Sequence, residues 1–136
     1  MRLPDLEVRT GAARELVEIT GPVRAALRAA RVREGLLVVA SPHTTAGVTV
    51  QENADPDVRR DLLLALSNAI PDAPPQGRYR HAEGNSPAHA MTSLVGTAAT
   101  LIVEDGELVL GTWQGVYLCE FDGPRTRTVM LKVIPG

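Results

Sequence analysis

Apolar and polar positions alternate with a period near two at the start of the chain and again over its last third, which is typical of half-buried strands. Opening strands are expected over residues 3–9 and 15–19. The continuous apolar run 35–40 predicts a strand buried on both faces, and a β-branched pattern resumes over 46–50. The later strands are expected at residues 98–103, 108–110, 112–121 and 126–134. The chain is therefore predicted to be rich in β-structure.

The spacing of apolar side chains changes to that of a helix in two places. Residues 21–31 follow a threonine that can cap a helix and carry a proline in the first turn. Residues 55–69 begin at Asp55, a capping carboxylate, and Pro56, which suits the first helical position. Because strands occupy both ends of the chain, the pattern predicts one α+β domain over residues 1–136. This domain has a largely antiparallel β-sheet or sandwich and two main helices in its N-terminal half.

A long polar segment follows the second predicted helix. Between Pro71 and Pro87 the chain is rich in proline, glycine and charged side chains, and we expect one continuous loop. Loops of this length inside a compact domain are usually functional or disordered. The segment is therefore a candidate for part of a functional site.

Composition limits the classes of function. The chain has 136 residues, of which 44% are hydrophobic and 22% charged, and its formal net charge is −2. These values are ordinary for a globular domain with an aliphatic core. The acidic balance and the four aromatic residues argue against a nucleic-acid partner, which needs basic patches or stacking platforms. No apolar run approaches the length of a membrane span and no signal peptide is recognisable, so a cytoplasmic protein is expected.

Cysteine chemistry is expected to play no part. Cys119 is the only cysteine, so neither an internal disulfide nor a cysteine-based zinc site can form. It lies in an apolar strand pattern, and we expect it to be a small core residue rather than a nucleophile.

The three histidines are the strongest candidates for chemistry. His43, His81 and His89 all lie at loop or element-boundary positions among small and polar neighbours. Three neutral imidazoles can hold a catalytic zinc ion and leave one position open for water or substrate. On spacing alone, three unrelated surface or capping histidines are the preferred interpretation, and the metal site is the alternative.

Carboxylates, hydroxyls and arginines add weaker candidates. Glu52 and Glu83 can each serve as a general base or as a partner of an imidazole, although a solvated charge is the simpler interpretation of either. Thr44 and Thr45 offer hydroxyls beside His43, but such turn residues more often bond their own backbone. Among the arginines near element ends, only Arg125, which follows a Gly-Pro turn, is favoured as an anion-binding residue. The others are expected to be solvated, namely Arg78, Arg80 and Arg127.

Long segments of the chain resemble a known family. They run from Pro42 through the His-Thr-Thr and Gln-Glu-Asn stretches to Asp61, and from Leu110 to Arg125. A middle motif contains His81, Glu83-Gly84-Asn85 and Ala88-His89. Together these segments closely resemble the YjbQ-like family, whose members are often labelled secondary thiamine-phosphate synthases.

The resemblance implies a site and an assembly. It implies an α+β subunit that forms a homotrimer, with His43, His81 and His89 converging on a bound metal near the subunit interface. His43 and Glu52 are the expected catalytic residues. The expected contacts to a small anionic substrate are Thr44, Thr45, Asn85, Gln114 and Arg125.

The family label implies one reaction, and the residues leave others open. The reaction named by the label joins hydroxymethylpyrimidine diphosphate to a thiazole phosphate with loss of pyrophosphate. Three imidazoles favour a divalent transition metal, zinc first, while Mg²⁺ is a further candidate with a phosphorylated substrate. The alternatives are a metal-dependent hydrolase, a small-ligand or metal-binding protein without turnover, and a structural trimer whose histidine pocket is vestigial.

Overall fold

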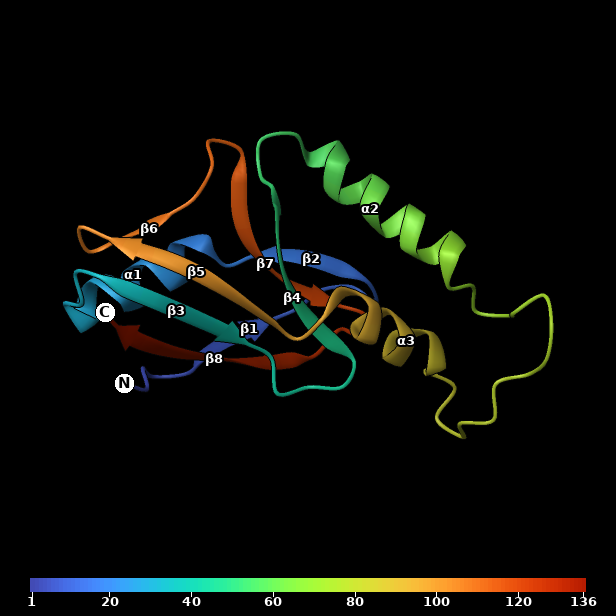
Figure 1. Ribbon diagram of the computed structural model, residues 1–136. Helices are drawn as coiled ribbons and strands as arrows, with labels where there is room; N and C mark the ends of the chain where they lie inside the picture. Colours follow the sequence, from blue (N-terminus) through green and yellow to red (C-terminus); the bar gives the residue numbers. More distant parts are fainter.

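Eight strands form two sheets in the structure, a computed structural model that describes residues 1–136 (Figure 1). The five-stranded sheet has the order β1-β8-β3-β5-β6, and the three-stranded sheet has the order β2-β7-β4. Every strand pair is antiparallel. The strands are β1 (Leu6–Arg9), β2 (Glu15–Glu18), β3 (Gly35–Ala40), β4 (Ala46–Glu52), β5 (Ala98–Glu104), β6 (Glu107–Val109), β7 (Gln114–Glu120) and β8 (Thr126–Pro135). The predicted α+β class and antiparallel sheets are confirmed.

The main core lies between the two sheets and is aliphatic. Leu37, Val39 and Val129 face it from the five-stranded sheet, and Val48 and Leu118 face it from the three-stranded sheet. All five side chains are at most 1% exposed. Burial of this apolar surface is the main stabilising contribution to the sandwich.

The strand that is buried on both faces is β7, and the prediction of that role for residues 35–40 was wrong. In β3 only alternate side chains are buried, and Leu36 is 40% exposed, because no helix covers the outer face of the five-stranded sheet. In β7 the residues after Gln114 are all buried. The side chains of Tyr117 and Cys119 form a second apolar cluster with half-buried leucines of the second helix.

The two predicted helices are present within one residue of their expected bounds. They are α1 (Thr20–Ala30) and α2 (Pro56–Ala69). The Asp55 side chain accepts a hydrogen bond from the backbone of Asp57 and caps α2, as its sequence indicates. No helix is long and apolar enough to cross a membrane.

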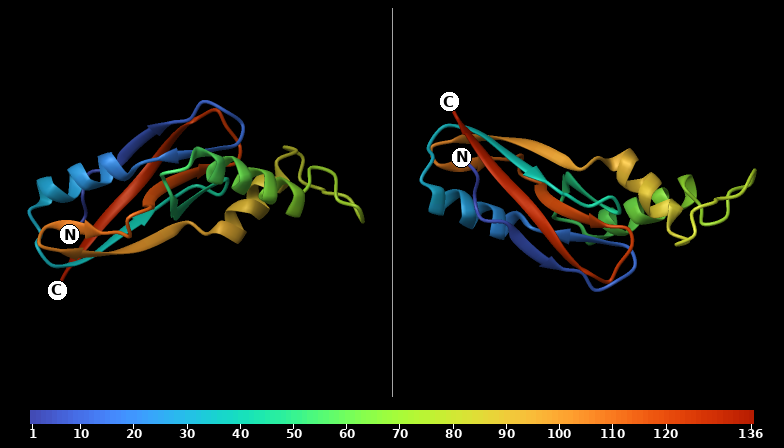
Figure 2. Two further views of the ribbon diagram at one scale, coloured as in Figure 1. Left: turned by 90° about the horizontal axis from the view of Figure 1, so that it is seen from above. Right: turned by 90° about the horizontal axis from the view of Figure 1, so that it is seen from below.

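A third helix, α3 (Ser86–Val95), was not predicted. The expected loop therefore ends at Asn85, two residues before Pro87, the expected end of the segment. Helix α3 buries Ala88 and Met91 against the three-stranded sheet, beside α2. Figures 1 and 2 show α2 and α3 together at one end of the molecule, with the chain between them extending away from the sheets. The start of α3 brings His89 and the preceding loop toward the β3–β4 connection.

Candidate functional site

One open cavity of about 390 Å³ gathers all three histidines, and we call it the histidine cavity. Three separate segments build its walls: the β3–β4 loop, the loop and first turn of α3, and the β7–β8 connection. Apart from Pro42, every lining side chain is polar or charged. The lining residues are Pro42, His43, Thr44, Thr45, His81, Glu83, Asn85, His89, Asp122, Arg125 and Arg127.

His43 is held on the strand side of the cavity by hydrogen bonds. Its backbone N–H donates to Ser41 Oγ, whose hydroxyl donates in turn to the carbonyl of Ala46 across the loop. Its Nε2 accepts a hydrogen bond of 2.9 Å from the backbone N–H of Thr128. Burial and then the positive charge of Arg127 lower the pKa of His43, so the ring is neutral near pH 7. With Nε2 accepting, a neutral ring carries its proton on Nδ1.

His81 and His89 lie together on the opposite side. Their ring centroids are 5.3 Å apart and the rings are nearly perpendicular. Nε2 of His81 is 4.0 Å from Oε1 of Glu83. His89 is fixed by the first turns of α3, whereas the His81 side chain lies on the preceding loop and is 45% exposed. This pair is therefore less constrained than His43.

A buried ion pair forms the floor beneath the strand side. The Arg127 guanidinium donates to both carboxylate oxygens of Glu120 and also to Thr45 Oγ1. Glu120 is fully buried and accepts further bonds from Thr10 Oγ1 and the backbone of Asp122. Burial opposes ionisation of Glu120, but the bonds from Arg127, Asp122 and Thr10 together lower its pKa.

The expectation that Arg127 is a solvated strand end was wrong. Arg127 is 4% exposed and sits on the inner face of β8, in the same alternation as Val129, Leu131 and Val133. The two-residue spacing between Arg127 and these apolar residues is visible in the sequence, and it could have identified Arg127 as an inward-facing side chain. Its partner Glu120 likewise ends the apolar run of β7.

Arg125, Asp122 and Asn85 form a second polar chain at the rim. The Arg125 guanidinium donates to the backbone carbonyl and the carboxylate of Asp122, at 2.7 and 2.9 Å. Asn85 Nδ2 donates to the same carboxylate at 2.9 Å. The negative charge of Asp122 is therefore compensated, while Asn85 Oδ1 is buried without a hydrogen-bond partner. Arg125 remains half exposed and can contact a ligand.

The two expected threonine contacts differ in what they can do. Thr44 is exposed at the cavity mouth, so its hydroxyl is available to a ligand. Thr45 is 7% exposed and accepts the hydrogen bond from Arg127, so its first role is to hold that arginine.

Glu52 and Gln114 do not line the histidine cavity of their own chain. They are paired in register at the far end of the β4–β7 ladder, whereas Thr45 lies next to the beginning of β4. At about 3.3 Å per residue, the six steps along the chain from Ala46 to Glu52 span roughly 20 Å. Gln114 Oε1 accepts a hydrogen bond from the backbone of Gly111. One chain thus brings together eight of the ten candidates, His43, Thr44, Thr45, His81, Glu83, Asn85, His89 and Arg125.

The histidines fit a metal ion only in part. His81 and His89 are close to each other and to a carboxylate, which suits a transition metal. Nε2 of His43 is already occupied by the Thr128 N–H, and no group of three or more His, Cys, Asp or Glu side chains is arranged to hold a metal. The three-histidine metal site expected from the sequence is not assembled in this arrangement.

The fold and the site together define a class: a small two-sheet α+β protein with an open cavity lined by histidines and arginines. Residues 4–136 match the family described as UPF0047 protein YjbQ-like. The chain belongs to this family.

Relatives and solved structures agree with that assignment. The chain is 46% identical to the UPF0047 protein YugU of Bacillus subtilis, over 97% of this chain and 98% of that protein. It is 45% identical to a UPF0047 protein of Methanocaldococcus jannaschii, over 94% and 91%. A crystal structure of a yjbq/upf0047 family protein from Clostridium acetobutylicum superimposes with a TM-score of 0.91 at 46% identity, covering 96% of this chain and 99% of that chain. A hypothetical protein from Aeropyrum pernix gives a TM-score of 0.92 at 33% identity, with 100% of both chains covered.

Proposed function

We propose that the histidine cavity binds a small phosphorylated molecule and that the protein is an enzyme acting at the phosphorylated end of that molecule. The observation that carries the proposal is the lining: three histidines and two arginines with no apolar side chain other than Pro42. The first reaction to test is thiamine-phosphate synthesis. Hydrolysis of small phosphate or ester substrates is the second.

The donors on the strand side suit phosphate oxygens. Arg125 is half exposed, Thr44 has a free hydroxyl, and neutral His43 offers Nδ1–H. Charge-assisted bonds from a guanidinium to phosphate are stronger than neutral ones, and they fix the orientation of the group. Arg127 adds positive charge from below, although its pairing with Glu120 compensates most of it. These groups support an anion at this wall.

The same donors would assist the transfer reaction that the family label names. In thiamine-phosphate synthesis the diphosphate group departs, and N–H donors placed before the reaction stabilise the negative charge that develops on it. His81 and His89 face this position from the opposite wall and can exchange a proton with the leaving group or with water.

A divalent transition metal, zinc in the first instance, remains part of the proposal. His81 and His89 are the residues that would hold it, with Glu83 as the neighbouring carboxylate. When bound, such an ion supplies a Lewis acid for a phosphoryl oxygen or activates water, and Mg²⁺ would do the former with a phosphorylated substrate.

We also propose that the protein assembles in the cytoplasm as a homotrimer, in which a neighbouring subunit supplies Glu52. Leu36, Ile102 and Ile134 are 40%, 52% and 50% exposed, and they lie side by side on the uncovered face of the five-stranded sheet. An exposed apolar patch of this kind favours burial against another protein surface. The role of Glu52 as a base then requires a second chain, because its own cavity lies at the other end of β4.

The experiment compares purified wild-type protein with Arg125→Ala, His43→Ala and the control Arg33→Ala. Arg33 is an exposed arginine paired with Asp105 and is remote from the cavity lining. Product formation should fall at least tenfold in the first two variants and stay unchanged in the control. Equal product from all four proteins would identify a contaminating activity and refute the proposal.

The shared role of Glu52 has its own test. Inactive His43→Ala and inactive Glu52→Gln proteins are unfolded together and refolded as mixed assemblies. Recovery of activity in the mixture, absent from either protein alone, is expected if each site uses residues from two subunits. No recovery in assemblies shown to be mixed would refute the contribution from a second chain.

A further inference from the structure

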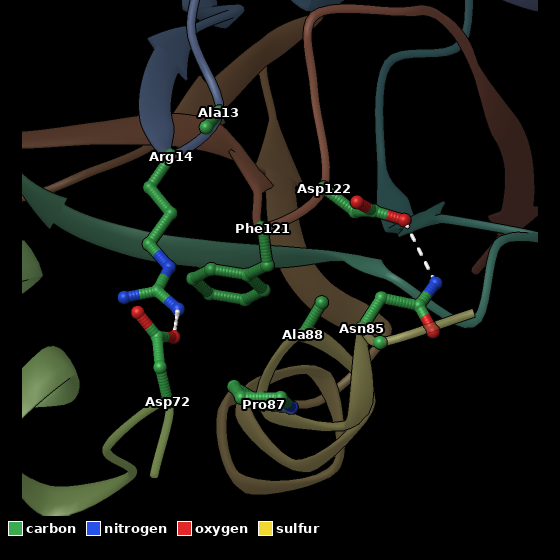
Figure 3. A pocket seen from close by; sticks show the side chains of 9 residues that line it. Ala13, Arg14, Asp72, Asn85, Pro87, Ala88, Phe121 and Asp122 are labelled. Carbon is green, nitrogen blue, oxygen red and sulfur yellow. Dashed lines mark hydrogen bonds and ion pairs between the residues drawn. The ribbon is translucent and has the colours of Figure 1, made fainter. Parts of the chain in front are cut away.

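A second open cavity, of about 410 Å³, adjoins the histidine cavity (Figure 3). Asn85 and Asp122 line both cavities, and the hydrogen bond between their side chains forms the ridge that separates them. The second cavity is bounded by the β1–β2 loop at Ala13, by the end of β7 at Phe121, and by the first turn of α3. We call it the Phe121 cavity.

The Phe121 cavity differs from its neighbour in chemistry. Ala13, Ala88 and Phe121 line it, whereas the histidine cavity has no apolar side chain other than Pro42. Ala13 is exposed, while Phe121 and Ala88 are each 3% exposed and present only an edge to the cavity. Figure 3 shows the Phe121 ring between the Arg14 side chain and the start of α3. Aromatic and small apolar walls of this kind favour a flat organic group over an ion.

The charged groups of the Phe121 cavity are already paired. The Arg14 guanidinium donates to Ser67 Oγ at 2.9 Å and to the carboxylate of Asp72 at 2.7 Å. Asp122 is compensated by Arg125 on the other side of the ridge. No uncompensated cation is left in this cavity for a second phosphate, and no uncompensated anion repels a phosphate that lies across the ridge.

We propose that the Phe121 cavity is a second subsite, which binds the flat apolar group of the phosphate ester whose phosphate lies in the histidine cavity. This inference rests on the proposed function, because it names the other half of the same ligand. The ligand lies across the Asn85–Asp122 ridge, with its ring against Phe121. Simple phosphates occupy one subsite, whereas aryl-bearing phosphates occupy both.

The test measures binding of three probes to the full chain by calorimetry: inorganic phosphate, methyl phosphate and benzyl phosphate. Benzyl phosphate should bind about tenfold more tightly than methyl phosphate, the effect of burying roughly half of a phenyl ring against apolar side chains. Ala13→Leu fills the Phe121 cavity from an exposed loop position and should abolish this advantage. It should leave the affinity for inorganic phosphate within about twofold, because Ala13 does not line the histidine cavity.

Ala29→Leu is the matched control, since Ala29 is exposed on α1 and lines neither cavity. Equal affinity of the wild-type protein for benzyl and methyl phosphate would overturn the second subsite and leave the proposed function standing. The same loss of affinity in Ala29→Leu and Ala13→Leu would also overturn it. Failure of all three probes to bind, by contrast, would refute the phosphate site itself.

Discussion

Replacing Arg127 with methionine should strongly destabilise the fold, because it leaves the charge of Glu120 buried. Glu120 is fully buried and accepts four hydrogen bonds, two of which come from the Arg127 guanidinium. Removing one partner of a buried ion pair costs about 3 to 5 kcal/mol. In a chain of this length, that corresponds to a fall in Tm of about 10 to 20 °C.

The loss should depend on pH in a defined direction. In the wild-type protein the pKa of Glu120 is lowered, so its contribution to stability is present above the ordinary carboxyl pKa and is lost as the pH falls through the folded pKa. In Arg127→Met the buried carboxyl lacks its cation, and burial raises its pKa instead. The difference in unfolding free energy between the two proteins should therefore be largest near pH 7 and shrink toward pH 5.

Urea unfolding at one fixed protein concentration measures both effects, because subunit association adds to the apparent stability. Lys132→Met is the control, since Lys132 lies on the same strand but is exposed on the outer face. The double variant Glu120→Gln with Arg127→Met should be more stable than Arg127→Met alone. A loss below about 1 kcal/mol that does not change with pH would refute the assignment of a buried, mutually dependent pair.

Three further predictions concern the thiol, the metal and the assembly. Burial raises the pKa of Cys119 to about 12. At pH 8 a thiol reagent should therefore label the folded protein roughly a thousandfold more slowly than it labels a peptide thiol. Rapid labelling would contradict the place of Cys119 in the core. Elemental analysis of protein purified without a histidine tag should show one transition metal per chain, and His89→Ala should lose it while keeping its circular dichroism spectrum. A wild-type protein without stoichiometric metal would exclude a resident ion. Light scattering at micromolar concentration should give three times the mass of one chain. Ile102→Lys on the uncovered sheet face should lower the measured mass toward that of a single chain. A monomeric wild-type protein would refute the trimer.

The strands could be predicted from the sequence because their alternation is strong, whereas α3 was missed inside a segment interpreted as a loop. Helix α3 is short, begins with Ser-Pro, has no side-chain cap, and buries Ala88 and Met91 only because the three-stranded sheet offers them a surface. The sequence does carry a weak helical signal, because Ala88, Met91 and Val95 recur at helical spacing after Pro87, but the segment is short and adjoins a polar, proline-rich loop. The positions of the helices also explain why β7 and not β3 is buried on both faces. Which apolar strand is covered on its second face depends on where the helices pack, and local sequence does not specify this.

The candidate site was predictable in its residue types but only partly in its arrangement. The three histidines, whose convergence only the family resemblance implies, line one cavity with Arg125. Glu52 follows His43 closely in sequence, yet an extended strand separates them, because a strand carries the chain about 3.3 Å with each residue. The hydrogen bond from Thr128 to His43 Nε2 joins residues 85 positions apart and leaves no trace in local sequence.

The two walls of the histidine cavity differ in how freely they can vary. The strand wall contains the Glu120–Arg127 pair, which also joins the ends of strands from both sheets, so substitutions there alter folding and ligand contacts together. The opposite wall is formed by a loop and the first turn of α3, and His81 and Glu83 have few ties to the core. Changes of ligand preference, in natural divergence or in a designed library, are therefore open mainly through residues 81–83, because Gly84 has a positive φ and Asn85 is bonded to Asp122 at the start of α3.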